Sequence, residues 1–205
     1  RARPRRDIMP MCNRWNALLL ALALVTAGPA SAQRPVPSGQ VREGTLSFDG
    51  KATAGDFVGS TKSVTGELTG GDNLAGVRGW IEAQTASLGS GNAHRDRDMK
   101  DKSLEAAKYP TMRFDLTGVS AASSTGDSLP VMLTGRLTIH GVTRQVELPA
   151  SVAFHDGEIR VRSDFPVDVT DYKVGSLSRF LGMFKMNPHI MVHVDVSFAA
   201  RPATP

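Results

Sequence analysis

Residues 190–198 alternate between apolar and polar side chains, with Met191 as the one exception. The apolar positions are Ile190, Val192, Val194, Val196 and Phe198. Successive side chains of a β-strand point to opposite faces, so this period of two is typical of a strand with one buried face. We therefore predict that Val192 and Val194 point into a core while His193 and Asp195 face solvent.

The same alternation recurs along the chain and predicts an all-β fold. It is visible at residues 46–48, 77–83, 112–117 and 133–140, and further strands are expected at 58–68, 146–154 and 158–169. The connections are short and rich in turn residues, which favours antiparallel hairpins over parallel crossovers. About eight strands with one apolar face each need closure, and an eight-stranded barrel is either filled by side chains or holds one small ligand.

One short helix is expected among these strands. Residues 98–108 have a helical composition, and Pro110 would end the helix because the residue before a proline avoids helical dihedrals. The predicted fold class is thus an antiparallel β-barrel of about eight strands with one short helix.

The first 32 residues have the pattern of a secretory signal peptide. Arg14 supplies positive charge, residues 17–27 form an 11-residue apolar run, and Ala30-Ser31-Ala32 offers the small residues needed for cleavage. The run is shorter than the roughly 20 apolar residues of a membrane span. We expect a secreted chain that starts at Gln33, periplasmic in a Gram-negative cell.

The remaining boundaries follow from composition. Residues 1–8 would be an upstream over-read if Met9 or Met11 is the true start. Residues 33–44 are expected to be a flexible N-terminal segment, 45–198 a single barrel domain and 199–205 a tail.

Charge and cysteine content exclude several classes of function. Five arginines and one aspartate lie in residues 1–32, which leaves 19 basic and 19 acidic residues in 33–205. A neutral body lacks the basic footprint of a nucleic-acid-binding protein. Cys12 is the only cysteine and precedes the expected cleavage site, so we expect no disulfide-linked partner and no thiolate chemistry.

Metal and catalytic sites find little support in the sequence. His189 and His193 are four residues apart on a predicted strand, a spacing of roughly 13 Å that is too long for one metal ion. His94, Asp96 and Asp98 suit either a cation-binding loop or a solvated, salt-bridged turn. His140 is placed at an exposed turn. The chain has no nucleophile elbow and no phosphate-binding loop, so we expect no catalytic residues, no metal and no cofactor.

Three stretches, in order, resemble the YceI-like family. Residues 135–148 (GRLTIHGVTRQVEL) resemble its G-x-L-T-x-x-G-V-T-x-x-V stretch. Residues 94–99 (HRDRDM) and 108–114 (KYPTMRF) resemble its RD…M segment and its K-Y-P-x-x-x-F segment. The resemblance runs from about residue 45 to residue 198.

The resemblance implies an exported, lipocalin-like barrel that carries an isoprenoid lipid or isoprenoid quinone without catalysis. Some members are linked only to envelope stress, so a ligand-free envelope protein with a packed barrel is the alternative. The oligomeric state is left open, a homodimer included.

Residues 175–188 depart from the family pattern because they are rich in Phe and Met. Leu177, Phe180, Leu181 and Phe184 have the spacing of one helical face, and Gly182 makes an irregular apolar loop an equal alternative. This segment is expected to act as a plug or a ligand-contacting lid at one barrel end. The candidate ligand-binding residues are Phe57, Phe114, Phe165, Leu177, Phe180, Leu181 and Phe184.

Overall fold

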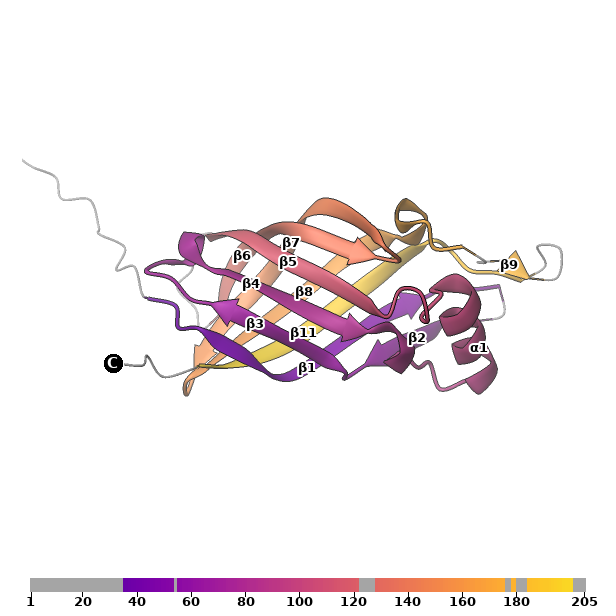
Figure 1. Cartoon of the computed structure of the whole chain (residues 1–205), viewed down its shortest axis with the longest axis horizontal. Coiled ribbons are helices and arrows are strands. Elements are labelled where there is room, and N and C mark those ends of the chain that lie inside the picture. Colours follow the sequence, from indigo (N-terminus) through magenta and orange to yellow (C-terminus); the bar gives the residue numbers. More distant parts are fainter. Residues whose placement is uncertain (1–34, 54, 122–127, 176–177, 180–183, 201–205) are drawn as a thin grey trace, which may run out of the picture. The chain divides into compact units, whose positions relative to one another are not determined.

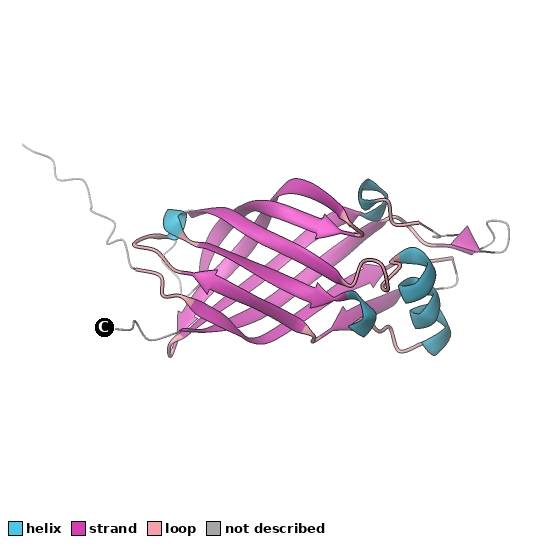
Figure 2. Ribbon diagram, in the orientation of Figure 1, coloured by secondary structure: helices cyan, strands magenta, loops and turns pink. Residues whose placement is uncertain are grey.

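The computed structural model describes residues 35–53, 55–121, 128–175, 178–179 and 184–200, all within one compact unit (Figures 1 and 2). The strands are β1 (Gly39–Gly50), β2 (Phe57–Thr61), β3 (Val64–Thr69), β4 (Arg78–Gln84), β5 (Thr111–Ala121), β6 (Ser128–Ile139), β7 (Val142–His155), β8 (Glu158–Asp168), β9 (Ser178–Arg179), β10 (Phe184–Lys185) and β11 (His189–Ala200). The helical elements are η1 (Leu74–Gly76), η2 (Thr85–Ser87), α1 (Ala93–Asp98), the π-helical turn η3 (Met99–Ser103) and η4 (Val169–Tyr172).

The main sheet is antiparallel and closes on itself. Its order is β11-β8-β7-β6-β5-β4-β3-β1-β2, and β1 also pairs with β11. Strands β2 and β3 pair with opposite ends of β1, so together they fill one position in the barrel. The result is an eight-stranded antiparallel barrel with one short α-helix, which confirms the predicted fold class (Figure 1).

Strand β11 has the register that the alternation predicts. Val192, Val194, Val196 and Phe198 are buried. His193 and Asp195 lie on the outer face, where they contact charged side chains of neighbouring strands. The inward row therefore belongs to the core, and the outward row is a band of ion pairs.

The N-terminal boundary of the barrel was predicted wrongly. The sequence suggested a flexible segment at 33–44, but β1 begins at Gly39 and pairs with β11 as far as Ala200. Val36 is also buried and exchanges two backbone hydrogen bonds with Gly71. These residues are ordered by partners far along the chain, which local composition does not reveal. The strand also takes in Ala199 and Ala200 of the predicted tail.

Two other element boundaries differ from expectation. The helix starts at Ala93, because the Asn92 side chain accepts hydrogen bonds from the amides of His94 and Arg95. It continues into η3, which ends at Ser103. The predicted strand at 58–68 is interrupted where the Thr61 hydroxyl accepts a hydrogen bond from the Ser63 amide. Short side chains that bond to nearby backbone compete with a strand ladder in this way.

The His140 side chain, at the turn between β6 and β7, is largely buried rather than exposed, which corrects the placement of His140. The His140 ring packs on Tyr109 with centroids 4.3 Å apart, and its Nε2 lies 2.8 Å from Glu105 Oε2. His140 and Gly141 both have positive φ, as a two-residue hairpin turn requires. The turn thereby fixes the segment that follows η3 against the barrel.

Replacing Gly141 by alanine should destabilise the protein more than the same change at Gly157. Both glycines have positive φ, which costs an alanine roughly 1–2 kcal/mol. A Cβ at Gly141 would lie 2.5 Å from the Tyr109 ring, whereas one at Gly157 meets no atom within 4 Å. Urea unfolding of the two variants measures the difference, and equal losses would show that the Tyr109 contact is unimportant.

The outer face of β1, β8 and β11 carries a pH-sensitive cluster. His193 Nδ1 lies 2.6 Å from Asp164 Oδ1, and Nε2 lies 3.4 Å from Asp49 Oδ2. The hydrogen bond to Asp164, helped by Asp49, raises the pKa of His193 above its ordinary value. A raised folded-state pKa stabilises the fold below pH 6.5, and this stabilisation is lost as the pH rises through the folded-state value.

His193→Gln should therefore lower the thermal midpoint more at pH 5.5 than at pH 8.5. The effect is expected to be small, because the side chain is 39% exposed and solvent screens the pair. Thermal melts of both proteins at the two pH values measure it. A larger decrease in the thermal midpoint at pH 8.5 than at pH 5.5 would contradict the raised pKa of His193.

Candidate functional site

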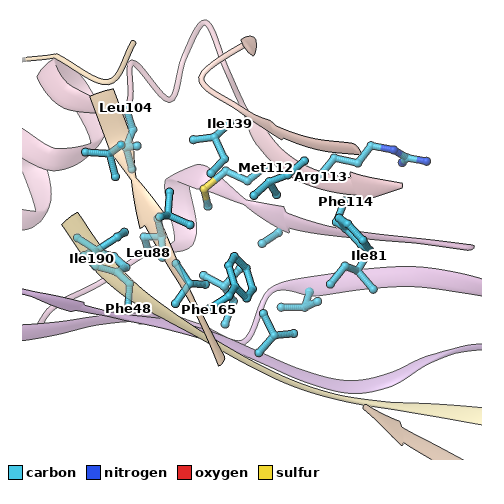
Figure 3. Close-up of a pocket in the computed structure, with 18 of the residues that line it drawn as sticks. Phe48, Ile81, Leu88, Leu104, Met112, Arg113, Phe114, Ile139, Phe165 and Ile190 are labelled. Carbon is cyan, nitrogen blue, oxygen red and sulfur yellow. The ribbon is translucent and has the colours of Figure 1, made fainter. Parts of the chain in front are cut away.

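The barrel contains a cavity of about 600 Å³ (Figure 3). All eight barrel positions contribute to its wall, which is mainly apolar. Figure 3 shows Phe48, Ile81, Met112, Phe114 and Phe165 directed into the space. Its volume is within the roughly 300–1,000 Å³ of typical small-molecule sites.

The cavity is closed at one end and open at the other. At the closed end, five buried side chains fill the barrel and are not part of the cavity wall. These residues are Val36, Val77, Val131, Val152 and Ile159. The exposed residues of the wall gather at the opposite end, near α1 and β10; they are Thr53, Gly55, Asn92, His94 and Lys185. A ligand with an apolar chain and a polar end can therefore lie along the barrel.

Charged side chains of α1 are held firmly at the open end. Asp96 accepts hydrogen bonds from the amide and hydroxyl of Ser90, which lower the pKa of its carboxyl. Arg95 donates to the Ser90 hydroxyl at 2.7 Å, and its guanidinium lies over the Phe57 ring at 4.1 Å. A cation over an aromatic face is attracted by the ring quadrupole. Arg95 and Phe57 thus form one side of the opening.

His94, Asp96 and Asp98 form a salt-bridged helix rather than a cation-binding loop. His94 Nδ1 lies 3.1 Å from Asp98 Oδ2, and Lys102 Nζ lies 2.9 Å from the other oxygen of the same carboxylate. Asp96 turns instead towards Ser90. Within the described ranges, no group of three or more metal-binding side chains is close enough to hold an ion.

Three of the seven predicted ligand-binding residues line the cavity. Phe57, Phe114 and Phe165 all contribute to its wall, and the Phe57 ring meets Phe48 edge-on at 6.0 Å between centroids. Contact of these residues with a ligand remains a prediction.

The other four predicted residues are not placed at the cavity. Leu177, Phe180 and Leu181 lie outside the described residues, as does the side chain of Phe184. For the described residues of this segment the helical alternative is wrong, because Ser178–Arg179 and Phe184–Lys185 are antiparallel paired strands. The Thr53 hydroxyl accepts a hydrogen bond from the Lys185 amide, so β10 is attached beside the open end.

Most residues of the cavity wall belong to no motif in the sequence. Phe48, Ile81 and Met112 occupy inward positions of the alternation, yet that signal is the same for a solid core and for a cavity wall. Leu88 and Leu104 directly follow the helical turns η2 and η3, where no alternation marks them. A buried polar side chain on the wall, Ser163, is satisfied by donating to the Pro149 carbonyl at 2.7 Å.

The helices give no evidence of a membrane span. In the part of the chain that the structure describes, none of them has both the length and the apolar character to cross a bilayer.

The fold is similar to solved structures at low sequence identity. A polyisoprenoid binding domain from Saccharophagus degradans, implicated in plant cell wall breakdown, aligns with a TM-score of 0.67 and 18% identity over 81% of this chain and all of that one. BcnA of Burkholderia cenocepacia aligns with a TM-score of 0.63 and 18% identity over 75% of this chain and 95% of that one. At these identities the likeness concerns the fold alone.

Sequence comparisons add a family. A UPF0312 protein of Pseudomonas savastanoi pv. phaseolicola is 40% identical over 73 residues, which are 35% of this chain and 35% of the relative. The match thus spans about a third of that relative's length. The family model described as YceI-like domain matches residues 40–198, which is most of the chain and nearly all of the barrel. The chain therefore belongs to the YceI-like domain family.

Proposed function

We propose that this protein binds a single-chain isoprenoid amphiphile, an isoprenoid lipid or isoprenoid quinone, inside the barrel and does so without catalysis. The observation that carries the proposal is the apolar cavity of about 600 Å³ with one closed and one open end. A packed, ligand-free barrel is the competing function, and a space of this size argues against it. The polyisoprenoid binding domain from Saccharophagus degradans supports the ligand class by analogy.

The size of the cavity suggests the length of chain it would hold. If each heavy atom takes about the 30 Å³ of a liquid water, the space of about 600 Å³ accommodates about 20 atoms, or four isoprene units. Each buried methylene contributes about 0.8 kcal/mol, so one five-carbon unit contributes about 3–4 kcal/mol. Ordering costs offset part of this, and micromolar or tighter binding still results.

The cell envelope is the proposed site of action. The signal-peptide pattern of residues 14–33 supports export, with Gln33 as the N-terminus of the exported chain. Isoprenoid lipids and quinones are poorly soluble in water, so they would need a carrier protein to move between membranes. N-terminal sequencing of the protein from a periplasmic fraction tests this step, and a chain that still contains residues 17–27 would contradict it.

Mass spectrometry of lipids extracted from natively purified protein tests the ligand class. The expected result is a stoichiometric isoprenoid compound that is absent from an unrelated protein purified in parallel. Titration of apoprotein with retinol, a fluorescent 20-carbon isoprenoid alcohol, gives an independent dissociation constant. A protein that carries no lipid and fails to bind retinol would be the packed barrel of the competing function.

A further inference from the structure

The barrel wall is split between β7 and β8 on the side of the open end. These strands pair only from Ser151–Arg162 to His155–Glu158, next to their connecting turn. Continued pairing would place Pro149 opposite Asp164 and Glu147 opposite Pro166. In the fully described stretches 142–150 and 163–168 no such pairing exists, although β7 still pairs with β6 and β8 with β11 throughout.

The sequence of the two strands explains why they separate. Pro149 and Pro166 have no amide hydrogen to donate, and proline is found in sheets where a strand edge is unpaired. The Ser163 hydroxyl, at the point of divergence, donates to the Pro149 carbonyl and occupies an acceptor that a strand amide would otherwise use. The separation is therefore built into the chain.

A second pocket of about 390 Å³ fills this split and reaches the wall of the main cavity. The two spaces share four wall residues, which are Leu137, Leu148, Phe165 and Val167. The outer rim is polar, with Arg144, Gln145 and Asp171 exposed at it. No strand ladder separates the cavity from solvent here. The side chains in the split and η4 do so, whereas ladders join the strands from β3 to β7 and join β8, β11 and β1.

The short helix η4 covers the split, and one exposed ion pair links it to β7. Its Tyr172 is buried and lines the pocket. Arg144 of β7 donates to the Asp171 carbonyl at 2.9 Å and lies 3.0 Å from the Asp171 carboxylate. Both side chains are about half exposed, and pairs of this kind contribute little to stability. The helix itself is anchored, because Val169 and Tyr172 are buried and the Val169 amide donates to the Pro188 carbonyl, so the weak contact at the split is the Arg144–Asp171 pair at its rim.

We infer that the split between β7 and β8 is a lateral entry site, through which the apolar chain of an amphiphile reaches the barrel cavity. Opening the wall along one of its ladders would break several backbone hydrogen bonds, whereas here the side chains in the split, Arg144 and Asp171 at the rim among them, have only to move apart. The polar rim suits an uncharged hydrogen-bonding end group, since its cation is balanced by a carboxylate. This inference rests on the proposed function for the identity of the ligand.

Stopped-flow fluorescence of retinol uptake and release tests the entry route. Arg144→Ala should raise both rates about two- to five-fold and leave the dissociation constant unchanged, which is the range expected from losing one exposed ion pair. Gln145→Trp, which places a large ring over the rim, should lower both rates. Arg160→Ala is the matched control, because it removes an ion pair with Asp195 on the outer face of β8 and should change neither rate.

Thiol labelling tests the opening itself without any ligand. In a Cys12→Ser background, Val167→Cys places a single buried thiol in the shared wall. Adding Arg144→Ala should accelerate its reaction with a water-soluble maleimide, and adding Arg160→Ala should not. If Arg144→Ala changes neither the labelling rate nor the retinol rates, the lateral entry site is overturned. If Arg144→Ala accelerates labelling as expected but the protein does not bind retinol, only the proposed ligand is contradicted.

Discussion

Val194→Asp should prevent the protein from folding. Val194 is 9% exposed and faces the barrel interior, between Leu46 of β1 and Ser163 of β8 in register. An unpaired carboxylate there loses several kcal/mol of solvation, which approaches the 5–15 kcal/mol total stability of a typical domain. Circular dichroism and the soluble yield of the variant measure the loss.

Asp195→Ala provides the control on the next residue of the same strand. Asp195 is on the outer face and accepts hydrogen bonds from Arg160 and Arg162, which lower the pKa of its carboxyl. Exposed pairs of this kind contribute about 0–1 kcal/mol, so this variant should fold with a nearly unchanged thermal midpoint. Similar losses in the two variants would reject the register of β11.

Leu133→Trp should shorten the chain that the cavity accepts. Leu133 of β6 lines the cavity opposite Val119 and Leu148 of the neighbouring strands. An indole here would displace about one isoprene unit, which removes about 3–4 kcal/mol and weakens binding of a 20-carbon isoprenoid alcohol roughly 100- to 1,000-fold. A ten-carbon isoprenoid alcohol should bind this variant as well as the wild type, because it does not need the lost space.

Met132→Trp is the matched control for this change. Met132 is the adjacent residue of β6 but faces outward and is 38% exposed. The same ring on the outer face should leave the affinities for both chain lengths unaltered. Isothermal titration of the two alcohols against both variants gives all four values, and equal losses for the long and short chains would exclude binding along the barrel axis.

Local sequence patterns were sufficient to predict the strands, their buried faces and their antiparallel connections. The alternation around Val192 and Val194 gave the buried face, and the closely spaced turns gave antiparallel neighbours. Phe57, Phe114 and Phe165 were predicted as ligand-binding residues, and all three line the cavity. A period of two is a local property, which is why reasoning from neighbouring residues was sufficient here.

The features that sequence reasoning missed depend on residues far apart in the chain. Gly39 is in a strand because Ala200 is beside it, and His140 is buried because Tyr109 and Glu105 cover it. The existence of a cavity depends on how the side chains of eight strands meet, and no single strand records it. The split at Pro149 and Pro166 did leave a sequence signal, since proline inside a predicted strand indicates an unpaired edge.

The pairing of β1 with β11 also has a consequence for the order of assembly. Each of the strands β3 to β7 pairs with the next strand along the chain, so β3 to β8 can form as successive hairpins, but the ring closes only when the last strand reaches the first. Contacts between such distant residues slow folding, because the entropy of closing a long loop is lost before the pairing compensates for it. Until that moment β1 and β8 each expose a strand edge able to pair with another chain. A newly made chain is therefore most prone to aggregation just before its final twelve-residue strand is in place.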